Sequence, residues 1–177
     1  MASIFSHALS GYAISSLNGN ISTRLLVAGI LATIIPDIDI IAFDFGIAYG
    51  DPLGHRGFTH SLLFAVILAV SIKMIFFRSE SIISKSSLFT IGFLFVCCAS
   101  HGLLDAMTNG GKGVGFFIPF DNDRYFLSFR PIQVSPIGAS RFFSDWGWKV
   151  IKSEVIYIGI PALLLILLSR LFNFRNR

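Results

Sequence analysis

The stretch HGLLD at residues 101–105 most constrains how this chain can fold, because it places an imidazole and a carboxylate at the end of a strongly apolar run. The run begins near Ser86 and reads LFTIGFLFVCCAS before it reaches His101. It predicts a membrane helix, and the spacing of four puts His101 and Asp105 on one helical face. Ionisable groups at such depth are costly and usually face a bundle interior where a partner compensates them. The stretch therefore predicts either a hydrogen bond that ties two helices together or a bound metal ion.

The composition predicts an integral membrane protein. Of 177 residues, 54% are hydrophobic and only 14% are charged, and the mean hydropathy is +0.74. A soluble domain of this size cannot bury so much apolar surface. The length suits one domain, which we expect to cover residues 1–177. The net charge of +4 is modest and dispersed, so we expect no nucleic-acid partner. Cys97 and Cys98 lie inside an apolar run and are interpreted as packing residues.

The pattern of apolar runs and breaks predicts an all-α, polytopic membrane helical bundle of about five helices. A turn signal at residues 18–20 follows the first helix, and Ser22 or Thr23 can cap the second, which we expect to stop at Pro36. Residues 40–54 are expected to form a membrane-surface loop or a short helix. Residues 109–150 form one long polar loop, in which 124–136 suggests a short β-hairpin or an extended loop. The expected helices are 3–17, 22–36, 60–78, 86–107 and 152–172.

The order of the helices predicts where the polar residues meet. If the five helices run up and down with short connections, the start of the first and third and the end of the second and fourth lie at one end of the bundle. All four histidines of the chain then gather there with at least three carboxylates. Metal sites in helical bundles are built in this way, from side chains on facing helices. The residues predicted to bind metal are His7, Asp37, Asp39, His55, His60, His101 and Asp105.

The donor types indicate which metal the site would hold. Nitrogen and oxygen donors without a usable thiolate suit Zn²⁺, with Mn²⁺ or Fe²⁺ as alternatives. Four histidines and three carboxylates exceed what one tetrahedral ion needs, so we expect one or two ions, with one Asp as the bridge between two. A metal-activated water would then serve as the nucleophile, and one of the acids, Asp39 or Asp105, would accept its proton.

Two arginines are candidates for holding a phosphate. Arg56 lies between His55 and His60, and the alternative interpretation is a salt bridge to Asp37, Asp39 or Asp51. The two interpretations of Arg56 stay open from the sequence. For Arg124, as for Arg130 and Arg141, contact with lipid headgroups is the favoured interpretation, because basic residues in juxtamembrane loops commonly meet them.

Several blocks together resemble a known family. They are PDID at 36–39, HRGFTHS at 55–61, HGLLDAMT at 101–108 and PF at 119–120, within a match that runs from His7 to RPIQVSP at 130–136. In order and spacing they are similar to the bacterial inner-membrane, metal-dependent hydrolases of the YdjM type, which implies a multi-pass protein of the bacterial inner membrane. That family is thought to be distantly similar to zinc-dependent phospholipase C and related single-strand nucleases, which are all-helical with a metal cluster.

The resemblance also implies roles for individual residues. An N-terminal His, an Asp, a further His and a His-x-x-x-Asp pair supply ligands in the phospholipase group. These roles fall on His7, Asp37 or Asp39, His55 or His60, and His101 with Asp105. The group's further block of two His and a Glu has no counterpart here, because no His follows Asp105. The third metal of a phospholipase-type cluster is therefore not expected.

Two functions follow from these patterns. The first is a membrane-bound metal-dependent hydrolase that cleaves a phosphoester, with a membrane lipid or a lipid-linked phosphate as substrate and Arg56, Asp39 and Asp105 as catalytic residues. The second is a non-catalytic membrane protein that uses the His/Asp cluster as a structural metal site or for metal transport. The apolar helices beyond the cluster offer few polar residues for a transport path, and this favours the enzyme.

Overall fold

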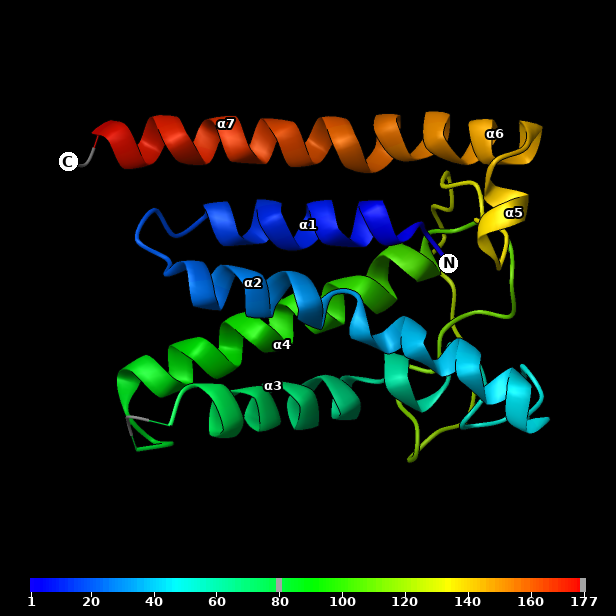
Figure 1. Ribbon diagram of the computed structural model, residues 1–177, viewed down its shortest axis with the longest axis horizontal. Helices are drawn as coiled ribbons and strands as arrows, with labels where there is room; N and C mark the ends of the chain where they lie inside the picture. Colours follow the sequence, from blue (N-terminus) through cyan, green and yellow to red (C-terminus); the bar gives the residue numbers. More distant parts are fainter. Residues whose placement is uncertain (79–80, 176–177) are drawn as a thin grey trace.

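The computed structural model describes residues 1–78 and 81–175, and in these residues the chain is all-α, as the sequence predicted (Figure 1). Five long helical stretches run along the longest axis of the molecule, with a loop region gathered at one end. The elements are α1 (Ile4–Ser16), α2 (Thr23–Ala32), the 3₁₀ helix η1 (Ile35–Phe45), the short 3₁₀ helix η2 (Phe58–His60), α3 (Leu62–Phe76), α4 (Lys85–Ala106), α5 (Ala139–Phe142), α6 (Asp145–Glu154), the π-helix η3 (Val155–Gly159) and α7 (Ile160–Arg175).

Serine side chains set the starts of the helices. The hydroxyl of Ser22 accepts a hydrogen bond from Leu25 N at the start of α2, and Ser61 accepts one from Phe64 N at the start of α3. Ser84 caps α4 in the same way. Each cap satisfies a backbone N–H that has no partner inside the helix. The capping residue of the second helix is therefore Ser22 rather than Thr23.

The second helix changes type instead of stopping at Pro36. The α-helix ends at Ala32, and the chain then continues as η1 with Pro36 in its first turn. Proline fits a first turn because its missing N–H would have no partner there. Residues 40–45 therefore belong to a helix, which ends at Gly46 in the left-handed conformation (φ 74°).

The last helix begins earlier than the sequence pattern predicts. It starts at Asp145 rather than residue 152, so Trp146 and Trp148 lie within it. A π-helical turn, η3, joins α6 to α7 immediately before Pro161. Proline cannot donate the usual backbone hydrogen bond, and a π turn is one way in which a helix accommodates such a break.

The apolar helices differ in whether they are long enough to cross a membrane. Among the described residues, three helical stretches are long and apolar enough to cross a membrane: Thr23–Phe45, Lys85–Ala106 and Asp145–Asn173. The apolar helix α3 is shorter.

Small residues in the core allow α2, α3 and α4 to approach closely. The main core cluster joins these helices through Leu25, Ala32, Ala65, Ala69, Ile72, Leu94, Cys97 and Cys98. Both cysteines are buried and free, as expected of packing residues.

The long loop closes one end of the bundle without forming a sheet. Within the described residues it contains no strand, only two isolated bridges, Thr108 to Ile132 and Val114 to Tyr125. Of the two expectations for 124–136, the extended loop is therefore the one observed. Its backbone reaches the helices, because Leu127 N donates to Ala106 O and Asn109 N donates to Ile132 O. The loop covers the end of α4 that carries His101 and Asp105 (Figure 1).

A glycine contact between α1 and α2 gives a test of this packing. A Cβ on Gly11 would lie 3.0 Å from a side-chain carbon of Thr33 and 3.1 Å from the Cα of Ile30, whereas a Cβ on Gly92 would meet nothing within 4 Å. We expect Gly11→Val to lower the free energy of unfolding in detergent by about 1–3 kcal/mol, because it overpacks the contact. Gly92→Ala should leave it unchanged or raise it slightly. A Gly11→Val protein as stable as Gly92→Ala would contradict this packing.

Candidate metal centre

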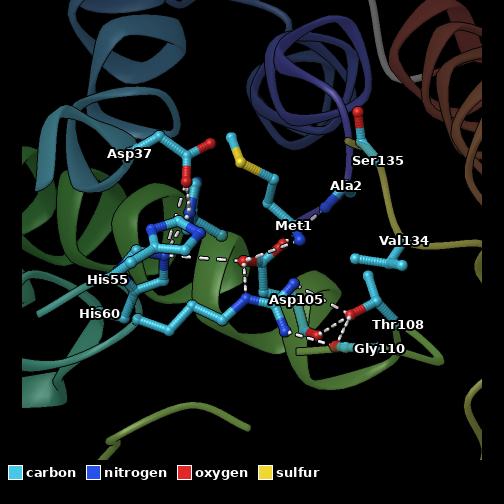
Figure 2. Close-up of polar contacts among 12 residues, drawn as sticks. Met1, Ala2, Asp37, His55, His60, Asp105, Thr108, Gly110, Val134 and Ser135 are labelled. Carbon is cyan, nitrogen blue, oxygen red and sulfur yellow. Dashed lines mark hydrogen bonds and ion pairs between the residues drawn. The ribbon is translucent and has the colours of Figure 1, made fainter. Parts of the chain in front are cut away.

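Residues from four separate parts of the chain meet at the loop-covered end of the bundle. His7 comes from the first turns of α1, Asp37 and Asp39 from η1, His55 and His60 from the segment before α3, and His101 and Asp105 from the last turns of α4. All seven are buried, with relative exposures between 0% and 8%. Figure 2 shows Asp37, His55, His60 and Asp105 close together near the start of α1. The predicted convergence at one end of the bundle is therefore observed.

Four of these residues form a group that could hold a metal ion. One donor atom from each of Asp37, His60, His101 and Asp105 lies within 4.8 Å of the others. Asp37 Oδ1 is 3.3 Å from His101 Nε2 and 3.6 Å from His60 Nε2. Asp105 Oδ2 is 3.6 Å from His60 Nε2. Two imidazoles and two carboxylates are a ligand set that tetrahedral Zn²⁺ accepts.

The hydrogen bonds of the two imidazoles direct both lone pairs into this group. His101 Nδ1 lies 2.7 Å from Thr33 O, which can only accept, so this nitrogen carries the proton. His60 Nδ1 lies 3.0 Å from Thr59 Oγ1 and 3.2 Å from Asp39 Oδ2. Because the Thr59 hydroxyl gives its own proton to Asp39, it accepts from His60 Nδ1, so this nitrogen also carries a proton. In the neutral rings each Nε2 then bears a lone pair, and the two Nε2 atoms are only 2.9 Å apart. Two facing lone pairs repel each other unless a cation lies between or beside them.

Other atoms of the group also call for a positive charge. Within the described part of the chain, Asp37 Oδ1 is buried and has no hydrogen-bond partner. Burial by itself would lower the pKa of His60, but Asp105, Asp37 and Asp39 outweigh burial and raise it to about 10. In the absence of metal, a proton on His60 therefore supplies the charge. A divalent cation would compete with that proton for the same lone pair.

Asp39 orients the histidines. Its carboxylate accepts hydrogen bonds from His55 Nδ1 at 2.6 Å, the Arg56 backbone N–H at 3.0 Å and the Thr59 hydroxyl at 2.7 Å, besides the contact with His60. Carboxylates that hold the outer nitrogen of a ligating imidazole fix its tautomer and ring orientation. Thr59 is thus a partner of Asp39, whereas Ser61 caps α3.

A second group shares one member with the first. Asp37, Asp39 and His55 each offer a donor atom within 4.8 Å of the others, so Asp37 belongs to both groups. His55 packs edge-on against His60 with ring centroids 5.7 Å apart. The arrangement has the donors for one or two ions, with Asp37 in the position of a bridge.

His7 lies against the cluster but outside both groups. Its ring stacks on His101 with centroids 3.8 Å apart and an interplanar angle of 17°. His7 Nε2 is 3.5 Å from Asp105 Oδ1, and within the described residues neither ring nitrogen has a hydrogen-bond partner. Its role as a ligand remains a prediction.

Arg56 pairs with a residue that the sequence interpretation did not name. Its Nε lies 2.9 Å from Asp105 Oδ2, an ion pair that is not aligned as a hydrogen bond. The two Nη atoms donate to Gly110 O and to the Thr108 hydroxyl, each at 3.0 Å. The ion pair is therefore with Asp105, not with Asp37, Asp39 or Asp51. Arg56 also has a positive φ of 63°, which is uncommon and costly for a residue with a side chain.

Backbone groups complete the site, and sequence reasoning missed them. Ala2 N donates to Asp105 Oδ1 at 2.7 Å, and Thr33 O holds His101. Glu154, at the end of α6, accepts from both the backbone N–H and the hydroxyl of Ser3 and so anchors the start of α1. Backbone partners leave no residue pattern in a sequence. Glu154, an acidic residue directly before an apolar segment, was the one usable signal among these groups.

The buried ion pair predicts a large effect of one substitution. Arg56→Gln leaves Asp105 without its guanidinium partner, and we expect the free energy of unfolding to fall by about 3–5 kcal/mol. Arg130→Gln is the matched control, because Arg130 is exposed and stacks on Phe126 at 4.4 Å. The control should change stability by less than about 1 kcal/mol. Equal losses in denaturant unfolding of the two variants would count against this role of Arg56.

Comparison with known proteins agrees with the resemblance seen in the sequence. The chain matches the family of the YdjM inner membrane protein over residues 1–176. It is 44% identical over 148 residues to the inner membrane protein YbcI of Escherichia coli (strain K12), which covers 82% of each chain. No solved structure matches the chain. The chain, with its membrane-length helices and its buried His/Asp cluster, therefore belongs to the YdjM family of inner membrane proteins.

Proposed function

We propose that this protein is a membrane-bound, metal-dependent hydrolase that cleaves a phosphoester in a membrane lipid or a lipid-linked phosphate. The observation that carries the proposal is the pair of imidazole Nε2 atoms of His60 and His101, 2.9 Å apart, flanked by the carboxylates of Asp37 and Asp105. This donor set fits Zn²⁺ best, and Mn²⁺ or Fe²⁺ also accept nitrogen and oxygen ligands.

We assign a different role in the reaction to each residue of the site. Asp37, His60, His101 and Asp105 would hold the ion, which when bound supplies a Lewis acid and a water of lowered pKa. Asp39 accepts three hydrogen bonds and lies 3.2 Å from His60 Nδ1, so we assign it the orientation of His55 and His60. Of the two candidate proton acceptors, Asp105 is the one whose Oδ2 has no aligned hydrogen bond, although this oxygen is also paired with Arg56 Nε. The charge of Arg56, next to Asp105, would stabilise negative charge that develops on a phosphate.

The surroundings of Asp37 favour a lipid substrate. The Asp37 side chain is 10% exposed, whereas those of His60, His101 and Asp105 are 0% exposed, so Asp37 is the open edge of the group. The same 3₁₀ helix carries exposed apolar residues, namely Ile38, Ile41 and Phe45. A substrate whose phosphate reaches this edge could place a hydrocarbon chain against these apolar side chains. This favours a lipid or a lipid-linked phosphate as the substrate.

One observation favours a second function, a structural metal site without catalysis. Structural zinc sites are closed by four protein ligands, whereas catalytic sites keep one position open. Here four donors are available to one ion and three of them are fully buried. An ion that joins η1, η2 and α4 in this way would stabilise the fold.

Metal content and turnover together test the proposal. Asp37→Asn removes a donor shared by both groups, and we expect the affinity for zinc to fall about tenfold or more. Asp44→Asn is the matched control, because Asp44 is an exposed acid of the same 3₁₀ helix. The measurements are zinc per chain after dialysis against a weak chelator and hydrolysis of a panel of phospholipids and soluble phosphodiesters.

The outcomes separate the two functions. Zinc-dependent hydrolysis that is lost in Asp37→Asn and kept in Asp44→Asn supports the hydrolase. Tightly bound zinc without turnover of any substrate, together with a lower melting temperature in Asp37→Asn, supports the structural site. Equal zinc content in both variants would rule out the assignment of Asp37 as a ligand.

A further inference from the structure

We infer that Tyr49, Lys112 and Arg124 form a binding site for a phosphate-bearing anionic group beside the metal centre. Two cations from the long loop lie over one aromatic ring: Lys112 Nζ is 5.9 Å and the guanidinium carbon of Arg124 is 5.7 Å from the centroid of Tyr49. Both distances are within the range of cation–π attraction. The ring of Tyr49 is thus in contact with two positively charged side chains.

Arg124 is held in a fixed position. Its Nη1 donates to His55 O at 2.7 Å and its Nη2 donates to Asp51 O at 2.8 Å. These acceptors are neutral carbonyls, so they orient the guanidinium without cancelling its charge. Its Nε is buried and has no hydrogen-bond partner among the described residues. Each Nη carries two hydrogens and donates only one of them in these bonds, so the rigid guanidinium keeps an N–H on both Nη atoms with which to bind phosphate.

The charge of this site is not neutralised by an ion pair. In residues 1–78 and 81–175, neither Lys112 nor Arg124 forms a salt bridge. Asp123 directly precedes Arg124 in the chain, and Asp51 lies close to Tyr49 in sequence, but neither forms a salt bridge with Lys112 or Arg124 among the described residues; the Asp51 carboxylate accepts from Ala48 N. Burial lowers the pKa of Arg124 more than Tyr49, Asp39 and Asp51 raise it, and the like charge of Arg56 lowers it further. A bound anion would favour the charged guanidinium.

The site adjoins the metal centre through two contacts. The ring of Tyr49 packs edge-on against His55 at 5.2 Å, and His55 in turn packs against His60 at 5.7 Å. Gly111 forms the other contact, with a φ of 87°; a Cβ there would lie 2.7 Å from the Tyr49 hydroxyl and 2.8 Å from Arg56 Nη1. The absence of that side chain lets Tyr49 and Arg56 approach each other. Arg56 reaches on to Asp105.

The chemistry selects the ligand class. A guanidinium fork with a neighbouring ammonium recognises the oxygens of a phosphate, from a lipid headgroup or from free phosphate. Lys112 is exposed, so such a group can reach its ammonium from the loop surface. Binding of a phosphate at this site does not require the proposed hydrolase activity. Only its later hydrolysis rests on the proposed function.

Binding is measured on the detergent-solubilised full chain after removal of metal with a chelator, so that the metal centre does not hold the probe. The probes are inorganic phosphate and a short-chain alkyl phosphate, titrated by calorimetry. Lys112→Gln should weaken binding of the preferred probe about tenfold, because one charge-assisted contact is lost. Lys112→Arg should restore it. Lys149→Gln is the matched control, since Lys149 is an exposed lysine on α6.

The outcomes also separate this site from the proposed function. Tighter binding of alkyl phosphate than of inorganic phosphate identifies a lipid headgroup as the ligand, and the reverse identifies free phosphate. Lys112-dependent binding to the metal-free chain, together with no hydrolysis of the phospholipid and phosphodiester panel by the zinc-loaded chain, would leave the site in place and remove the hydrolase. No binding to the wild-type chain, or equal binding to Lys112→Gln and Lys149→Gln, would overturn the inference.

Discussion

Two imidazole nitrogens that face each other at 2.9 Å are the constraint on which the rest of this structure depends. The outer nitrogen of His60 faces Thr59 Oγ1 and Asp39 Oδ2, and that of His101 donates to Thr33 O. With both rings neutral this arrangement is unfavourable, so it needs a positive charge, either a proton on His60 or a metal ion. The carboxylates of Asp37 and Asp105 also require a positive charge nearby. A cation that supplies this charge lowers the cost of burying ionisable groups at the end of an apolar bundle.

The elements around this pair act mainly to hold it. The change from α2 to η1 at Thr33 leaves a carbonyl for His101 and directs Asp37 and Asp39 inward. Glu154 anchors Ser3, and the neighbouring Ala2 donates to Asp105, so the last helix fixes the first one over the cluster. Arg56, in a strained conformation, connects Asp105 to the long loop. Local strain of this kind persists only where the surroundings enforce it.

Helix order was enough to predict the fold class and the meeting of the seven polar residues, because antiparallel helices with short connections bring alternate ends together. The sequence could not predict the length of η1, since the stop signal of Pro36 also fits the first turn of a new helix. It could not assign the partner of Arg56 either, because Asp105 was one of several acids expected at the same end. The contacts of Arg124 depend on the path of an extended loop, which no periodicity describes. For that reason the sequence favoured a lipid contact for Arg124, and its place beside Tyr49 became visible only in the structure.

The most direct test of the central claim is X-ray absorption spectroscopy of the purified protein loaded with one equivalent of zinc. The account predicts a first shell of about four nitrogen and oxygen ligands near 2.0–2.2 Å, with the outer-shell scattering of two imidazoles and no sulfur. A zinc ion bound through sulfur, or one without imidazole scattering, would contradict the account. So would a chain that fails to retain zinc at all.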